Sequence, residues 1–191
     1  MRVTLWALTT GAGETSASVI VNSTISGNRA TDRIGGLYAY EQLALSNSTI
    51  AFNTAASGLV SAVGVYAYNG LAINSTILPN NTWAGNEFDL SAFPATGANN
   101  LIMGSDDSPP GTLTADPQLQ PLAANGGPTL THAILATSPP ADAGNNVAGL
   151  ATDQRGVGFV RLYGAHVDIG AFELQPVLPD EIFRNGFEGP E

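Results

Sequence analysis

The chain has 191 residues, of which 43% are hydrophobic and only 12% are charged, enough for one domain with a buried core. Its formal net charge of −10 argues against nucleic acids and anionic lipid headgroups as partners. The sequence has no cysteine, which excludes disulfides and thiol chemistry, and no apolar run approaches the roughly 18 residues of a membrane span.

Residues 1–8 form a short apolar run with one positive charge, which breaks at residues 9–13 and is short for the core of a secretion signal. We interpret this run as part of an incomplete coil of β-structure. An open coil edge aggregates unless it is capped, so we expect more N-terminal coils in a longer chain.

A nine-residue phrase recurs at residues 21–29, 46–54 and 73–81. Each copy keeps Asn-Ser-Thr-Ile, two variable residues and then a second Asn, and the first Asn falls at Asn22, Asn47 and Asn74. A period within the range of about 20 to 50 residues is typical of a solenoid or a propeller. A propeller blade needs four strands and usually about 40 residues, more than one copy of this repeat offers, which favours the solenoid.

The stretch from Val19 to Ile25 is rich in β-branched residues and lacks helical spacing, which indicates a strand. Side chains alternate across a strand. We expect Ile25 to face inward, because the opposite phase would bury the first Asn of each phrase, which is costly unless its amide is paired. The expected inward residues are Val19, Val21, Ser23 and Ile25 in the first copy, Ala44, Ser46, Ser48 and Ile50 in the second, and Leu71, Ile73, Ser75 and Ile77 in the third.

Short strands joined by turns rich in Gly and Asn, without a crossover helix, predict an all-β right-handed parallel β-helix. Its coils stack at about 4.8 Å, so equivalent residues lie above one another. We therefore expect two stacks, Asn22 with Asn47 and Asn74, and Ile25 with Ile50 and Ile77. The second Asn of each phrase should form a ladder at a turn, because Asn tolerates the left-handed conformation and its amide bonds along the stack. The ladder residues would be Asn28, Asn53 and Asn80.

A second phrase, Gly36-Leu-Tyr-Ala-Tyr40, recurs as Gly64-Val-Tyr-Ala-Tyr68. With Leu37 and Ala39 turned inward, the tyrosines face out as a two-by-two aromatic patch on adjacent coils, formed by Tyr38, Tyr40, Tyr66 and Tyr68. The favoured interpretation is a cross-strand ladder that stabilises neighbouring strands. The alternative is a stacking platform for sugar rings or for a partner.

After the third copy the phrase is lost, although apolar residues between 83 and 103 are able to supply degenerate coils, and residues 104–111 form a loop by composition. We therefore assign residues 1–112 to the β-helix coils.

The segment from Leu113 to Glu173 has a different character. It contains five short motifs: Asp-Pro-Gln-Leu-Gln-Pro-Leu (116–122), Asn-Gly-Gly-Pro-Thr-Leu-Thr-His (125–132), Ser-Pro-Pro-Ala-Asp-Ala-Gly (138–144), Asp-Gln-Arg-Gly (153–156) and Asp-Ile-Gly-Ala-Phe-Glu (168–173). This series resembles the C-terminal region of the bacterial choice-of-anchor Q family, which follows parallel β-helix repeats. Four of the five motifs match as written, and the third departs only at Pro140, where the family prefers Ala.

The resemblance implies an exported or cell-surface bacterial protein without a defined enzymatic activity, from a family whose members use different anchoring tails. Residues 113–174 would be its capping region, and residues 175–191 a Pro-rich linker with a short sorting or anchor-like tail. The end of that tail resembles a short Ile-Phe-x-Asp-Gly-Phe-Glu ending of exported proteins of some gamma-proteobacteria, with Asn185 where Asp is usual. We expect the capping region to close the C-terminal side of the coils and to bury Ile169 or Phe172.

Charged residues of the C-terminal motifs are expected to hold the cap together. Arg155 with Asp153 or Asp168 would form a partly buried ion pair. The structural cap residues are Asp153, Arg155, Asp168 and Glu173. A calcium site built from Asp oxygens is the alternative, although no Asp-x-Asp-x-Asp-Gly loop is present, and no other cofactor is expected.

The sequence offers few residues for catalysis. The coils contain Asp32 and Glu41 as acids and Arg29 and Arg33 as bases; these do not recur, and lysine is absent. A nucleophilic triad would need His132 or His166 near an activated Ser, and no Gly-x-Ser-x-Gly elbow is present. We therefore expect a structural hydrogen bond at His132 and assign no catalytic residue.

Two hypotheses of function follow. The favoured one is a non-enzymatic exported or cell-surface β-helical protein, structural or adhesin-like, with a cell-surface glycan or surface protein as its partner. The alternative is a polysaccharide-binding or polysaccharide-degrading protein, lyase or hydrolase, of the same fold. The missing acid pairs and the absence of lysine favour the first.

Overall fold

The computed structural model describes residues 17–31, 34–56, 63–105 and 107–176. Within these residues the protein contains 15 strands and no helix. The strands form four sheets, and every strand pair between coils is parallel. The one antiparallel pair among the described strands is a hairpin of β11 (Thr82–Trp83) and β12 (Asn86–Glu87). The predicted all-β parallel β-helix is therefore confirmed, and the propeller alternative is wrong.

Successive coils add strands to the same four sheets. The first sheet contains β1 (Ser18–Val21), β5 (Leu43–Ser46), β9 (Leu71–Asn74) and β14 (Ala95–Thr96). The second, called the docking sheet below, contains β2 (Thr24–Ser26), β6 (Thr49–Ala51), β10 (Ile77–Leu78) and β15 (Leu101–Ile102). The third contains β3 (Arg29–Ala30), β7 (Thr54–Ala55), β11 (Thr82–Trp83) and β12 (Asn86–Glu87). The fourth, called the tyrosine sheet, contains β4 (Leu37–Ala39), β8 (Val65–Ala67) and β13 (Leu90–Ala92).

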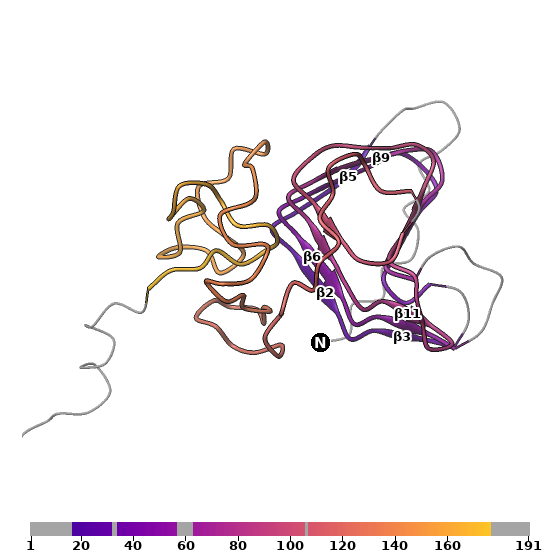
Figure 1. Ribbon diagram of the computed structural model, residues 1–191, viewed down its shortest axis with the longest axis horizontal. Helices are drawn as coiled ribbons and strands as arrows, with labels where there is room; N and C mark the ends of the chain where they lie inside the picture. The colour runs from indigo at the N-terminus through magenta and orange to yellow at the C-terminus, as the bar shows by residue number, and fades with distance from the viewer. Residues whose placement is uncertain (1–16, 32–33, 57–62, 106, 177–191) are drawn as a thin grey trace, which may run out of the picture.

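The coils enclose one apolar core, and the C-terminal region, residues 113–176, lies outside it. Figure 1 looks along the stack of coils and shows that region beside the sheet that contains β2 and β6. The core is made of residues from the first sheet, the docking sheet and the tyrosine sheet, among them Leu37, Leu45, Ile50, Ile73 and Leu78.

The register between coils differs from the expected one in the third copy of the phrase. Coils one and two pair as predicted, with Ile25 beside Ile50. Between coils two and three, however, Ser46 pairs with Asn74 and Thr49 with Ile77. The expected stacking of Asn74 on Asn47 and of Ile77 on Ile50 is therefore wrong by one residue. The second phrase pairs as expected on adjacent coils, with Tyr38 beside Tyr66.

A corner between the first sheet and the docking sheet explains both the shift and the side-chain phase. The corner residue of each coil has a left-handed conformation, with φ of 46° at Asn22, 48° at Asn47 and 46° at Ser75. Ser75 thus takes the place that the sequence pattern gave to Asn74. A left-handed residue breaks the strand, so side-chain alternation restarts after it.

The restarted alternation corrects part of the predicted inward face. Before the corner, Leu45 belongs to the core and Ile20 packs against it, whereas Val19 is 66% exposed. The expectation that Val19, Val21, Ala44 and Ser46 face inward is therefore wrong, while the expectation for Leu71 and Ile73 is correct. After the corner, Ile25 and Ile50 face the core as predicted, but Leu78 takes the third place and Ile77 belongs to a different cluster.

The asparagine ladder exists, with Asn81 rather than Asn80 in the third coil. The Nδ2 group of Asn28 donates to Oδ1 of Asn53 (3.0 Å), and Nδ2 of Asn53 donates to Oδ1 of Asn81 (2.8 Å). Nδ2 of Asn81 in turn donates to Oδ1 of Asp89 (2.8 Å), so a carboxylate ends the ladder. Asn80, the residue before Asn81, is exposed and has a left-handed backbone conformation with a φ of 56°.

This ladder gives a direct test of the register. Asn53 is fully buried, and its side chain bonds Asn28, Asn81 and the carbonyl of Ile25. Asn53→Ala should lower the free energy of unfolding by about 3 kcal/mol, because it leaves buried polar groups without partners. The matched control is Asn80→Gly, which removes the side chain without straining a positive φ and should change stability little. Urea denaturation would measure both; equal losses would contradict the ladder through Asn81.

Candidate functional site

The outer face of the docking sheet holds the C-terminal region. Nδ2 of Asn22 donates to the carbonyl of Thr152 (2.7 Å), and Nδ2 of Asn47 donates to the carbonyl of Asn145 (3.0 Å). Ser75 at the third corner also donates to the carbonyl of Asn145 (2.8 Å). The recurring corner residues are therefore contacts between the coils and the C-terminal region.

Outward threonines and an isoleucine continue this interface. The hydroxyl of Thr24 donates to Oε1 of Gln154 (2.5 Å), and the hydroxyl of Thr49 accepts the amide of Ala171 (3.1 Å). Ile77 of the third coil, which pairs with Thr49, packs in an apolar cluster with Leu101, Ile134, Ile169 and Phe172. The one-residue shift in the third coil thus turns an isoleucine outward, where the C-terminal region buries it.

The C-terminal region runs along the side of the coils instead of across their last turn. It contacts the first coil through Asn22 and the third through Ser75. Within the described part of the chain, only the bridge between Leu101 and Leu113 extends the stack beyond β15. The expectation that residues 113–173 close the C-terminal side is therefore corrected, whereas Ile169 and Phe172 are buried as expected.

Arg155 is the centre of the C-terminal region. Its guanidinium bonds Oδ2 of Asp153 through Nε (2.9 Å) and Nη2 (2.7 Å). The same guanidinium lies 3.9 Å from the ring centroids of both Phe159 and Phe172. Nη2 also donates to the carbonyl of Glu173 (2.5 Å). A buried cation is here paired, hydrogen-bonded and sandwiched between two aromatic faces, which offsets its desolvation.

The other two expected cap residues join this network through backbone amides. Oε2 of Glu173 accepts the amide of Asp168 (2.9 Å), and Oδ2 of Asp153 accepts the amide of Glu173 (2.8 Å). Asp168 makes no ion pair with Arg155; its carboxylate accepts the amides of Asp142 and Leu174. The sequence reasoning missed Arg161, a buried arginine whose Nη2 donates to the carbonyl of Asp168 (2.5 Å) and lies 3.8 Å from Glu173.

Three buried carboxyl groups, Asp89, Asp168 and Glu173, have raised pKa values, and burial is the largest cause in each. Burial raises the pKa of Asp89 to about 7, although hydrogen bonds from Asn81 and Gly104 act in the opposite direction. Burial likewise raises the pKa of Glu173 to about 7, against the hydrogen bonds from Asp168 and Tyr163. The Arg161 guanidinium, 3.8 Å away, also lowers the pKa of Glu173, but burial has the larger effect.

These pKa values predict how stability depends on pH. In the unfolded chain the same groups titrate near 3.8 and 4.5, so between about pH 4 and 7 the native state holds protons that the unfolded chain has released. Stability from these groups should therefore fall as the pH rises through that window. Chemical denaturation at pH 5 and pH 8 should show a larger loss in the wild type than in Glu173→Gln, which cannot ionise. Identical pH dependence in the two proteins would contradict the raised pKa of Glu173.

The sandwiched guanidinium yields a second mutational test. Arg155→Lys should lower the free energy of unfolding by about 3 kcal/mol, because an ammonium cannot keep both hydrogen bonds to Oδ2 of Asp153 and both ring contacts. The control is Arg29→Lys, since Arg29 is exposed on β3 and should tolerate the change. Thermal unfolding of both variants would check this, and a stable Arg155→Lys protein would overturn the assigned role.

His132 joins the C-terminal region to the first coil. Its Nδ1 lies 2.8 Å from the carbonyl of Gln120, to which it donates, and Nε2 then accepts the hydroxyl of Ser26 (2.7 Å). Burial lowers the pKa of His132, which keeps the ring neutral and able to accept. The pair has the geometry of a nucleophile and its base, but a carbonyl takes the place of the orienting acid. His132 therefore makes hydrogen bonds of the structural kind that we expected.

Of the remaining sequence candidates, the structure describes Arg29, Glu41 and His166. Asp32 and Arg33 lie outside the described residues. Among the residues that are described, no ion pair joins Glu41 to Arg29, and His166 is exposed and contributes its backbone amide to Asp142. Within the part of the chain that the structure describes, no group of three or more His, Asp or Glu side chains is placed to hold a metal ion.

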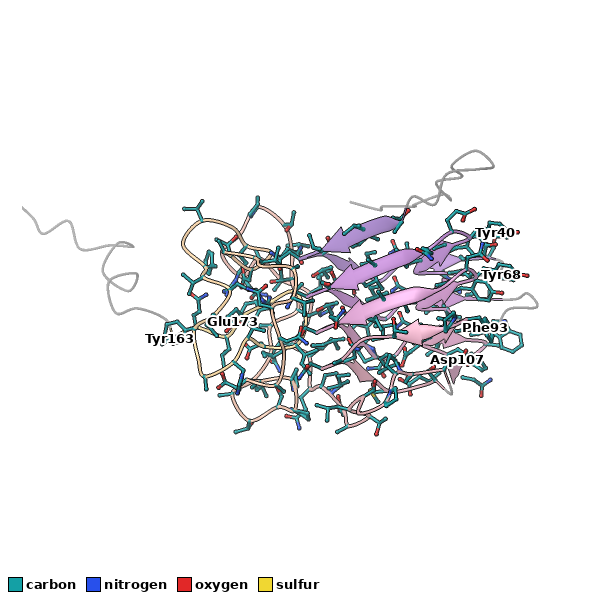
Figure 2. All side chains as sticks on the ribbon, turned by 90° about the horizontal axis from the view of Figure 1, so that it is seen from above. Tyr40, Tyr68, Phe93, Asp107, Tyr163 and Glu173 are labelled. Carbon is teal, nitrogen blue, oxygen red and sulfur yellow. The ribbon has the colours of Figure 1, made fainter. Side chains whose placement is uncertain are left out.

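The aromatic patch lies on the tyrosine sheet, on the side of the molecule opposite the C-terminal region. The rings of Tyr38 and Tyr66 stack with centroids 5.5 Å apart, and those of Tyr40 and Tyr68 with centroids 5.1 Å apart. Phe93 follows in the third coil, since Ala92 pairs with Ala67. Figure 2 shows Tyr40, Tyr68 and Phe93 in a column at one edge of the molecule, with Tyr163 and Glu173 at the other.

Sequence reasoning placed the four tyrosines but missed Phe93. The sequence does contain a pattern that indicates Phe93, because Ala-Phe at residues 92–93 matches Ala-Tyr at residues 39–40 and 67–68. The stacked geometry agrees with the cross-strand ladder. We define Tyr38, Tyr40, Tyr66, Tyr68 and Phe93 as the aromatic strip.

Comparison of the chain with family models, with curated proteins and with solved structures found no match. Among the residues described, no helix is sufficiently long and apolar to cross a membrane.

Proposed function

We propose that this protein is an exported, non-enzymatic β-solenoid of the bacterial cell surface, with a structural or adhesin-like role. Its five C-terminal motifs, which resemble those of the choice-of-anchor Q family, support export and surface location. In this proposal the coils are a rigid support and the C-terminal region is a brace along one side.

One observation carries the proposal: the two sides of the solenoid have different surfaces. The outer face of the docking sheet is occupied by hydrogen bonds to the C-terminal region, from Asn22 in the first coil to Ser75 in the third. The tyrosine sheet instead presents aromatic side chains that are about half exposed, 49% for Tyr40 and 48% for Tyr68. Clustered exposed aromatics are enriched at recognition surfaces.

The geometry gives less support to an enzyme. A glycosidase needs two carboxyl groups across the scissile bond, at a separation of about 5 to 10 Å. The described carboxylates with raised pKa values, Asp89, Asp168 and Glu173, are buried and bonded to backbone amides. Their hydrogen bonds serve the ladder and the C-terminal region, which is a structural role.

Two measurements test the proposal: the turnover of polysaccharides by the purified protein and the location of the protein in the cell. Purified protein incubated with polygalacturonate, alginate, cellulose and chitin should release no reducing ends and no unsaturated uronates. In a bacterium that produces it, protease added to intact cells should remove the protein, or the protein should be found in the medium. Turnover of any of these polymers, or a protein held in the cytoplasm, would contradict the proposal.

A further inference from the structure

The aromatic strip has a repeat that is regular along the solenoid axis. Its two tyrosine pairs repeat at 5.5 and 5.1 Å, close to the strand spacing that sets the distance between coils. The interplanar angles are 3° and 6°, so successive rings are nearly parallel. Within one coil, Tyr38 and Tyr40 are next-nearest neighbours along the chain and hence on the same face, about 7 Å from each other.

The two columns of the strip end differently. The column that begins with Tyr40 continues through Tyr68 to Phe93, which is 55% exposed. The column that begins with Tyr38 stops at Tyr66, because the next residue, Ser91, is buried. The segment that follows β15 bonds β13 on both sides of Ser91: the hydroxyl of Ser105 donates to the carbonyl of Leu90, and Asp107 accepts the amide of Ala92.

The tyrosine hydroxyls are the polar groups of the strip. Among the described residues, none makes a hydrogen bond with any of the four tyrosine hydroxyls. The exposed part of each side chain therefore combines ring carbon with a hydroxyl that both donates and accepts. Such a surface suits a ligand with alternating C–H and hydroxyl groups.

The charges beside the strip select against an anionic ligand. Glu41 follows Tyr40 in the chain, and Asp107 lies near Phe93 at the other end (Figure 2). The whole chain has a net charge of −10, so its field adds to the repulsion of an anion. Uronate polymers are therefore disfavoured, and a neutral polymer is favoured.

We infer that the aromatic strip binds a neutral, linear, β-1,4-linked polysaccharide that lies along the solenoid axis. Such a chain advances by about one sugar ring for each coil that it crosses. Each coil then offers the next sugar an equivalent set of ring and hydroxyl contacts. This inference rests on the proposed surface function and assigns the ligand class of its exposed face.

The experiment is retention of the purified protein on insoluble cellulose and chitin, with polygalacturonate gel as the anionic comparison. Wild type should be retained on at least one neutral polymer and not on polygalacturonate. Retention should persist between low salt and about 1 M salt, because the contacts are not ionic. Tyr40→Ala/Tyr68→Ala should weaken binding by about tenfold or more, as expected when two aromatic contacts are lost.

Two further variants separate binding from folding. Tyr40→Leu/Tyr68→Leu keeps apolar bulk on the sheet and should fold, but it should lose retention in the same way. Tyr163→Ala removes a tyrosine that is 53% exposed on the opposite side and should bind as wild type does. The melting temperature of each variant confirms that it is folded.

The inference is overturned if wild type is retained on neither neutral polymer, if it is retained equally on polygalacturonate, or if the folded leucine variant binds like wild type. These outcomes leave the proposed non-enzymatic function standing, since that proposal fails only on turnover or location.

Discussion

The register between stacked coils is the constraint on which the rest of this structure depends. It is held by side-chain amides that bond from coil to coil, Asn28 to Asn53 to Asn81, in a column closed to water at Asn53 and Asn81. Buried amides without partners are costly, so a slip of one residue would lose several bonds at once. Together with the left-handed corner residues, this column decides which side chains of each coil point inward and which point out.

The outward residues explain why the protein has two unlike sides. On the docking sheet, corner amides and threonine hydroxyls bond the C-terminal region, and Ile77 adds the apolar contact. The described part of the C-terminal region contains isolated β-bridges but no strand, and a buried network around Arg155 holds its loops together. The tyrosine sheet keeps the same stacking but leaves its rings exposed, and there the register produces an aromatic strip with the spacing of the coils.

Much of the fold could be predicted from the sequence, because residues that stack in neighbouring coils recur at a regular spacing along the chain. The phrase at Asn22 and Asn47 and the repeat of Tyr38 at Tyr66 each gave correct neighbours. The third copy misled because Asn74 precedes its corner by one residue; a serine is able to occupy the left-handed position there, and no local signal marks the change. Phe93 was missed because it replaces a tyrosine. The docking of residues 113–176 on one side depends on tertiary contacts between segments far apart in the chain, such as Asn22 and Thr152, which periodicity does not report.

The central claim is that the corner residues of the coils seat the C-terminal region on one side and leave the opposite side free. The hydroxyl of Ser75 accepts the backbone amide of Asn145 (2.6 Å) and lies 3.1 Å from its Oδ1, so these two residues are in direct contact. The chain has no cysteine, so an engineered pair is unambiguous. Ser75→Cys/Asn145→Cys should form an intramolecular disulfide on mild oxidation, measured by mass spectrometry of the digested protein, whereas Tyr68→Cys/Asn145→Cys should not. Absence of the first disulfide, or formation of the second, would contradict the account.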